Sequence, residues 1–233
     1  MSTRIPLLLL PGLLCDAALW QHQIKALKDI ADIRVADLTK QDSMSALAEA
    51  ALAKAPEKFA LAALSMGGYV ALEIMRQAPE RVTKLCLIDT SARADTDDQK
   101  KRRTMLLVMA KKGQFKGVTP RLLPMLIHPD RMEDTELTGI VMTMAERVGR
   151  EAFNNQQTAI LNRIDSRPTL KTIKCPVQVI GGEQDALTPP DIVTEIAHGI
   201  KGAKLALIEN CGHLSPLEQP DEVTELMKEW LLK

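Results

Sequence analysis

The sequence predicts an α/β fold in which a mostly parallel sheet of about six strands carries helices on both faces. Two observations support this class. Short apolar runs alternate with helical patterns from residue 5 to 88 and again from 177 onward, which is typical of βα units. Between these stretches, helical periodicity occurs without a strand pattern. We therefore expect a core formed by residues 1–94 and 162–233, with a helical cap or lid inserted at 95–161.

The core elements follow from the positions of the apolar runs. A continuous run such as Ile5–Leu10, which ends at Pro11-Gly12, is typical of a strand buried on both faces. Helical spacing of apolar residues follows the runs, and Ser43 is a suitable N-cap for the second helix. We expect strands at 5–10, 32–36, 59–64, 84–88, 177–180 and 204–208, and helices at 16–27, 43–52, 66–77, 190–198 and from 216 onward.

The predicted cap is interrupted by glycines and prolines and holds six of the eleven methionines. Methionine packs adaptably and recurs at surfaces that fit varied apolar partners. We interpret these side chains first as packing between helices, with a lid over an aliphatic pocket as the alternative. The residues are Met105, Met109, Met125, Met132, Met142 and Met144.

Charge and cysteine content argue against several function classes. Lys+Arg and Asp+Glu each number 30 in the 233-residue chain, so the formal net charge is zero. Neither nucleic acid nor a membrane surface is indicated as a partner. The four cysteines are widely spaced and form no CxxC pair, so neither a disulfide framework nor a zinc site is predicted. Reduced thiols fit the cytoplasm, which is the expected location.

The N-terminal apolar run resembles a short signal peptide because Arg4 precedes it. The sequence Leu14-Cys15-Asp16 is also close to a lipoprotein cleavage site. The bulky Leu14 and the absence of a following A-x-A-like site argue against secretion. The run is also too short to span a membrane. A buried strand is therefore the favoured interpretation.

The strongest chemical motif is ALSMGG at positions 63–68, after the third predicted strand. A nucleophile elbow carries a serine on a tight strand-to-helix turn and needs small residues two positions before and after it. Ala63 and Gly67 meet this need around Ser65, and Gly68 adds a second glycine. In an isolated motif, such a serine is as readily an ordinary helix N-cap. The preceding strand, the following helix and downstream partners favour a nucleophile.

The expected partners of Ser65 are Asp185 and His213, each just past the end of a predicted strand. Side chains at the carboxyl ends of parallel strands gather at one edge of the sheet. The chain order Ser, Asp, His is the one expected for a nucleophile on such a turn. Asp185 is the first choice for the acid that orients His213, followed by Asp89 and then Glu183. The other histidines are interpreted as solvated or packing side chains, namely His22, His128 and His198.

An oxyanion hole requires two backbone N–H groups close to the nucleophile. Met66, the residue after Ser65, is the first expected donor. Leu13 is the second, in the loop after the first predicted strand. Its neighbour Gly12 permits close approach of the backbone to a substrate.

Together these motifs resemble the α/β-hydrolase superfamily, and within it small bacterial carboxylesterases and enol-lactone hydrolases. The likeness rests on SMGG at 65–68, GxxDxxxP at 182–189, GH at 212–213 and ExP at 218–220. It covers the two core segments and leaves the insertion unmatched. Two departures are present. Pro11 stands where a histidine often precedes the glycine, and the first two strands of the usual sheet are missing.

The resemblance implies a serine hydrolase that cleaves a carboxylic ester of a small, largely apolar substrate through an acyl-enzyme at Ser65. It implies no cofactor and no metal, and the only partner expected is the small-molecule ester, with a homodimer left open. The same triad also suits lactone or enol-lactone hydrolysis, carbon–carbon bond hydrolysis or perhydrolysis. A non-catalytic ligand-binding receptor of the same fold is the alternative from another class. A dinucleotide-binding oxidoreductase is disfavoured because no GxGxxG follows the first strand.

Overall fold

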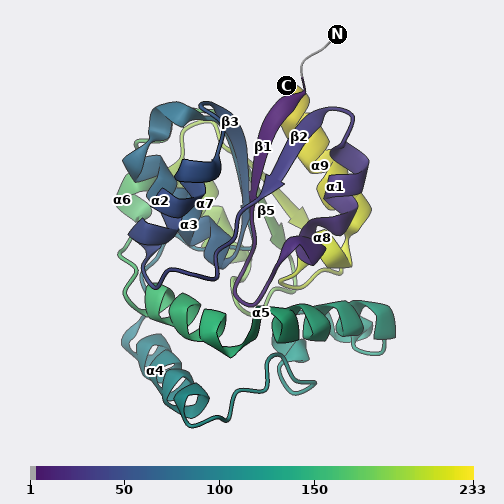
Figure 1. Ribbon diagram of the computed structural model, residues 1–233. Helices are drawn as coiled ribbons and strands as arrows, with labels where there is room; N and C mark the ends of the chain where they lie inside the picture. The colour runs from purple at the N-terminus through teal and green to yellow at the C-terminus, as the bar shows by residue number, and fades with distance from the viewer. Residues whose placement is uncertain (1–3) are drawn as a thin grey trace.

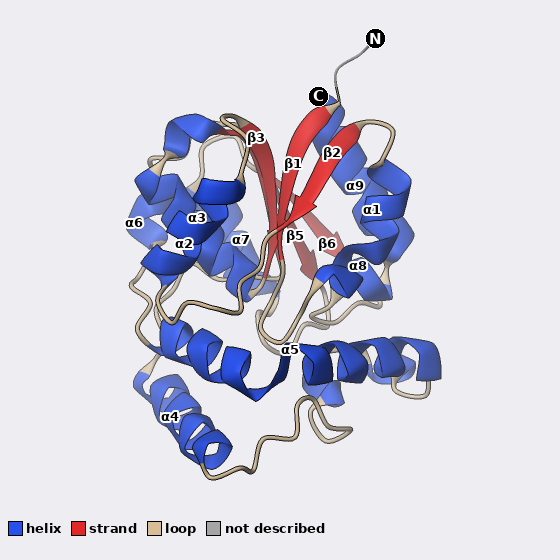
Figure 2. Ribbon diagram, viewed as in Figure 1, coloured by secondary structure: helices blue, strands red, loops and turns tan. Residues whose placement is uncertain are grey.

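The computed structural model describes residues 4–233, and its centre is a six-stranded parallel sheet (Figures 1 and 2). The strands lie side by side in the order β2-β1-β3-β4-β5-β6. The predicted α/β fold with a sheet of about six strands is confirmed. The strands are β1 (Ile5–Leu10), β2 (Ala31–Val35), β3 (Phe59–Leu64), β4 (Val82–Ile88), β5 (Val177–Gly182) and β6 (Lys204–Ile208).

The place of each strand in the sheet follows from its residues. Every residue of β3 and of β5 is buried, as expected for central strands covered on both faces. β2 carries the exposed residues Asp32 and Arg34, and β6 begins with the exposed Lys204 and Leu205. Charged and exposed positions are tolerated there because β2 and β6 are the two edge strands.

Helices cover both faces of the sheet (Figure 2). Successive side chains of β1 serve opposite faces, with Leu8 and Leu10 in one apolar cluster and Leu7 and Leu9 in the other. One face is covered by α1 (Gln21–Leu27), α8 (Ser215–Glu218) and α9 (Pro220–Leu232). The other is covered by α2 (Met44–Lys54), α3 (Met66–Gln77), α6 (Arg167–Leu170) and α7 (Pro190–Gly199).

The inserted segment lies across the carboxyl ends of the strands (Figure 1). It contains the α-helices α4 (Asp97–Lys111) and α5 (Thr135–Leu161). Between them are the 3-10 turns η3 (Leu123–Met125) and η4 (Pro129–Arg131). α5 is kinked at Gly149, whose φ of 79° and ψ of 179° are not helical.

Several predicted boundaries shift because of local backbone chemistry. The predicted first helix begins as a 3-10 turn, η1 (Ala17–Trp20), and a second such turn, η2 (Pro79–Arg81), leads into β4. The single helix predicted from Pro216 onward is two helices, because Gln219 has a non-helical φ of −127° and ψ of 61°. A residue that precedes a proline is disfavoured in the helical conformation, and Pro220 follows it directly.

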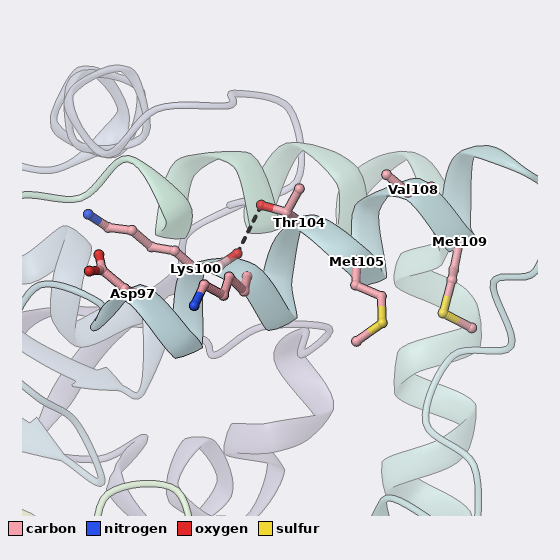
Figure 3. A pocket seen from close by; sticks show the side chains of 7 residues that line it. Asp97, Lys100, Thr104, Met105, Val108 and Met109 are labelled. Carbon is pink, nitrogen blue, oxygen red and sulfur yellow. Dashed lines mark hydrogen bonds between the residues drawn. The ribbon is translucent and has the colours of Figure 1, made fainter.

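The packing interpretation is wrong for two of the cap methionines. Met105 and Met109 are 57% and 42% exposed. With Val108 they border an open hollow on the solvent side of α4 (Figure 3). By contrast, Met144 of α5 is buried. The reason is that α4 packs chiefly on α5 and leaves its other side uncovered, which its own sequence pattern could not reveal.

The N-terminal apolar run is an integral part of the sheet. β1 pairs with β2 on one side and with β3 on the other. Leu7 to Leu10 are at most 2% exposed. Within residues 4–233, no helix combines the length and apolar character needed to cross a bilayer.

Candidate active site

Ser65 lies on the turn between β3 and α3. Its φ of 52° and ψ of −115° are values that a non-glycine residue adopts only where surrounding contacts impose them. The Ser65 N–H donates to the Ile88 carbonyl at 3.0 Å, and the Thr90 hydroxyl donates to the Ser65 carbonyl at 2.7 Å. These bonds tie the turn to the end of β4 and hold the half-buried serine in its strained conformation.

The two glycines after Ser65 are required by close packing. A Cβ on Gly67 would lie 2.8 Å from the carbonyl oxygen of Pro11, and one on Gly68 would lie 2.6 Å from the Cβ of Thr90. Both distances are shorter than ordinary van der Waals contact. Because Gly67 lacks a side chain, α3 can begin directly against the loop after β1, and because Gly68 lacks one, α3 can also pack against Thr90 after β4.

His213 joins Ser65 to Asp185. Its Nε2 lies 2.8 Å from the Ser65 Oγ, and its Nδ1 lies 2.7 Å from the Asp185 Oδ2. Burial of the ring opposes the imidazolium, but the charge and hydrogen bond of Asp185 outweigh burial and raise the pKa of His213. The structure thus brings the three residues into one hydrogen-bonded line, with Asp185 and His213 buried.

Asp185 is itself held by the turn that follows it. The N–H groups of Leu187 and Thr188 donate to its Oδ1 at 2.7 and 3.0 Å, and the Thr188 hydroxyl donates to Oδ2 at 2.5 Å. Burial alone would raise the pKa of Asp185, but the His213 charge and these hydrogen bonds lower it. Sequence reasoning missed Thr188, although it lies within the GxxDxxxP motif at 182–189.

The two lower-ranked acids do not contact His213. Glu183 is exposed. Asp89 is buried, and its carboxylate instead accepts hydrogen bonds from the Gly182 N–H at 2.9 Å and the Ser215 hydroxyl at 2.6 Å. Burial, and then repulsion by the Asp185 charge, raise the pKa of Asp89 to about 8. Asp89 therefore ties the ends of β4 and β5 to the loop that carries His213.

The loop that carries His213 is organised by Glu218, which sequence reasoning quoted only as part of a motif. The buried Glu218 carboxylate accepts from the N–H groups of Gly212 and Leu214 at 3.1 and 3.0 Å. It also accepts from the His128 N–H at 2.6 Å. His128 belongs to the cap, so one buried carboxylate joins the cap to the loop of His213.

The expected oxyanion donors, Leu13 and Met66, belong to the two segments that meet at the serine, the loop after β1 and the start of α3. Met66 is the first residue of α3, where the N–H has no partner within the helix. Among the described residues, the Leu13 N–H makes no hydrogen bond. A Cβ on Gly12 would lie 3.5 Å from the Ser65 Cβ, which shows how closely the loop after β1 approaches the turn.

The other histidines and cysteines have ordinary surroundings. His22 pairs with Asp221 at 3.1 Å, the His128 Nδ1 accepts from the Asp130 N–H, and His198 is exposed. Burial raises the pKa of Cys15 to about 12, so this thiol is a poor nucleophile. Within residues 4–233, no group of three or more His, Cys, Asp or Glu side chains is arranged to hold a metal ion.

The parallel sheet, the strained serine turn and the cap over the strand ends together define an α/β hydrolase. The model of the alpha/beta hydrolase family matches residues 7–226, and the chain belongs to this family.

Known proteins of the same fold include named esterases. A thermophilic esterase from Thermogutta terrifontis, with malate bound, has a TM-score of 0.89 at 28% identity, over 100% of this chain and 91% of that one. An enol-lactonase from Burkholderia xenovorans LB400 has a TM-score of 0.89 at 21% identity, over 100% and 93%. A pimeloyl-[acyl-carrier protein] methyl ester esterase from Nitrosomonas europaea is 24% identical over 93% of this chain and 91% of its own length.

These relatives confirm the predicted resemblance to small bacterial esterases. The protein is an ester-hydrolysing enzyme.

Proposed function

We propose that the protein cleaves a carboxylic ester of a small, largely apolar substrate through an acyl-enzyme at Ser65. The observation that carries this proposal is the line from Ser65 Oγ through His213 to Asp185, with contacts of 2.8 and 2.7 Å. This arrangement activates a serine, because His213 can accept the hydroxyl proton while Asp185 stabilises the resulting imidazolium.

The reaction proceeds in two halves. Ser65 Oγ forms a bond with the carbonyl carbon as its proton moves to His213 Nε2. The tetrahedral intermediate then collapses, the bond to the alcohol oxygen breaks, and His213 returns the proton to the departing alcohol. In the second half, His213 takes a proton from water as the water oxygen attacks the acyl carbon. The carboxylic acid then leaves and Ser65 regains its proton.

The negative charge on the substrate oxygen is stabilised by the N–H groups of Leu13 and Met66. The unpaired Leu13 N–H and the position of Met66 at the start of α3 support these roles. The N-terminal end of a helix also carries partial positive charge, which favours an oxyanion. No step requires a metal or a cofactor.

The surroundings of the oxyanion loop support an apolar substrate. The buried cluster beside Leu14 consists of the cap residues Ala110, Ala145 and Phe153. Leu13 packs against this cluster, together with Leu106, Phe115, Val118 and Val148. This aliphatic and aromatic packing beside the oxyanion loop supports an apolar acyl or alcohol group on the cap side of Ser65.

The four cysteines bear on where the enzyme works. All four are free thiols, and Cys15, Cys86 and Cys211 are buried. We propose the cytoplasm as its location, because reduced thiols persist there. Thiol titration of denatured protein purified without reductant should find four thiols per chain, and loss of thiols in pairs would contradict this.

A panel of p-nitrophenyl esters of increasing acyl length, together with simple lactones, tests the reaction and the substrate class. Short and medium acyl esters should turn over many times per chain, and Ser65→Ala should abolish this activity. Ser45→Ala, which changes an exposed serine, serves as the matched control and should stay fully active. Full activity in Ser65→Ala would contradict the proposal. Binding without multiple turnover would instead indicate a receptor.

A further inference from the structure

We propose that Gln156, on the cap helix α5, is a positioning residue that holds the oxyanion loop in its working shape. The inference rests on the proposed function, because it assigns Gln156 a role in setting the Leu13 donor. Gln156 is completely buried. Its Oε1 accepts from the Leu14 N–H at 3.1 Å, and its Nε2 donates to the Leu38 carbonyl at 3.1 Å.

The loop needs such a partner because its backbone is strained. Leu14 has a φ of 57°, a region that disfavours residues with a Cβ. Two bonds run within the loop itself, from the Cys15 N–H to the Gly12 carbonyl at 3.2 Å and from the Cys15 thiol to the Leu13 carbonyl at 3.5 Å, and neither provides an acceptor for the Leu14 N–H. Left without Gln156, the buried Leu14 N–H would lose its acceptor, and the strained conformation would lose the contact that opposes its relaxation.

Anchoring Leu14 also constrains Leu13. The peptide unit that contains the Leu14 N–H begins at the carbonyl of Leu13. Its fixed orientation limits rotation about the Leu13 backbone, and the Leu13 N–H is one Cα away. Gln156 therefore acts on the oxyanion donor through the backbone and does not touch the substrate.

The amide of Gln156 fits this task better than a charged or hydroxyl side chain. One end must accept from an N–H and the other must donate to a carbonyl, and a buried neutral amide does both. Its neighbour Asn155 donates to the Thr39 and Lys40 carbonyls at 3.1 and 3.3 Å. The second half of α5 is thereby fixed to the loop after β2, so Gln156 reaches Leu14 from a firm support.

The consequence is that the cap takes part in the chemical step. An oxyanion donor acts more strongly on the transition state than on the bound ester, so its displacement lowers kcat and leaves KM nearly unchanged. Gln156→Met keeps the side-chain length and removes both hydrogen bonds. We expect kcat to fall by about 10- to 100-fold, which is less than complete removal of an oxyanion donor produces.

Gln157→Met is the matched control. Gln157 is also buried on α5, but its Oε1 accepts from the Arg103 side chain at 2.9 Å and so serves packing within the cap. Gln157→Met should destabilise the protein to a similar degree and leave kcat unchanged. Gln156→Glu keeps an oxygen acceptor for Leu14 and should recover part of the activity that Gln156→Met loses.

The decisive readout is the affinity for an alkyl trifluoromethyl ketone. Ser65 Oγ adds to the carbonyl carbon of such a ketone as its proton moves to His213. The ketone oxygen becomes an oxyanion that faces the N–H groups of Leu13 and Met66. Gln156→Met should weaken this inhibitor by the same factor as kcat, while affinity for the carboxylic acid product stays unchanged. If Gln156→Met does not fold, Gln156→Asn, which is one methylene too short to bridge both partners, carries the same test.

Equal losses of kcat in the Gln156 and Gln157 variants would overturn the inference, because the effect would then be general destabilisation. A rise in KM alone, or unchanged kcat in Gln156→Met and Gln156→Asn, would also overturn it. Failure of the proposed function is a separate result. It would be seen as trifluoromethyl ketone binding that is as tight in Ser65→Ala as in the unsubstituted enzyme.

Discussion

The carboxyl edge of the sheet and the helical cap above it differ in how their side chains are partnered. At the sheet edge, Ser65, Asp185 and His213 come from three strand ends and are connected by short hydrogen bonds. On the cap, α4 leaves Met105 and Met109 largely exposed. The core thus presents a fully connected polar array, whereas the cap meets it only at selected contacts. We conclude that the core determines the chemistry and that the cap adjusts and covers it.

The largest effect should come from disrupting the polar array of the core. Asp185→Asn keeps the shape of the side chain but removes the charge that stabilises protonated His213, so kcat should fall by about 10⁴-fold. Asp89→Asn is the matched control. Asp89 makes no hydrogen bond to His213, so Asp89→Asn leaves the charge beside the imidazolium in place and should lose far less of kcat than Asp185→Asn. Steady-state hydrolysis of p-nitrophenyl acetate measures both, and a larger loss in Asp89→Asn would reverse the assignment of the acid.

The pH profile should reflect the electrostatics of the same array. His213 acts as a base only when neutral, so kcat/KM should fall as the pH drops through its pKa. Burial lowers the pKa of His213, but the charge and hydrogen bond of Asp185 outweigh burial and raise it. The midpoint of the kcat/KM profile should therefore lie above 6.5, the ordinary pKa of histidine. Asp185→Asn leaves burial without this opposition and should move the midpoint to lower pH. A midpoint that is the same in both proteins would contradict this account of His213.

Two glycines of α5 test the shape of the cap. Both positions have open space for a Cβ, but Gly149 has a φ of 79° and lies at the kink, while Gly139 is helical. Gly149→Ala should destabilise the protein by about 1–3 kcal/mol, because its backbone conformation is accessible almost only to glycine. Gly139→Ala should stabilise it by about 0.5–1 kcal/mol. Urea unfolding measures both, and changes of the same sign would argue against the kink.

The smallest effect is expected on the exposed side of α4. Met105 and Met109 have little packing to lose, so Met105→Gln combined with Met109→Gln should change the free energy of unfolding by less than about 0.5 kcal/mol. Thermal unfolding and the elution volume on gel filtration provide the measurement. A clear destabilisation together with a change in elution volume would mean that this face packs against a second copy of the chain.

The core was predictable because local patterns determine it. The run at 59–64 is apolar without interruption, and β3 begins and ends at those residues. Ser65 was identifiable from a strand, a tight turn and a helix in succession. Asp185 and His213 were identifiable because each follows a predicted strand, and parallel strands bring their carboxyl ends together.

The remaining features depend on contacts between distant parts of the chain. Gln156 meets Leu14 across 142 positions, and along its own helix a glutamine shows no sign of being buried. Asp89 binds Gly182 and Ser215, which belong to the other core segment. Met105 is exposed because α4 packs chiefly on α5 and, among the described residues, no other helix covers its far side. Periodicity reports which residues share a face of a helix, and it does not report whether that face is covered.

The central claim is that Ser65 attacks the ester carbonyl, and mass spectrometry after reaction with an alkyl fluorophosphonate tests it most directly. The reagent should add once per chain, on the peptide that contains Ser65, with loss of fluoride. The adduct should be absent from Ser65→Ala, strongly slowed in His213→Ala and unchanged in Ser45→Ala. Labelling of a different residue in the unsubstituted enzyme, or ester hydrolysis that persists in Ser65→Ala, would contradict the account.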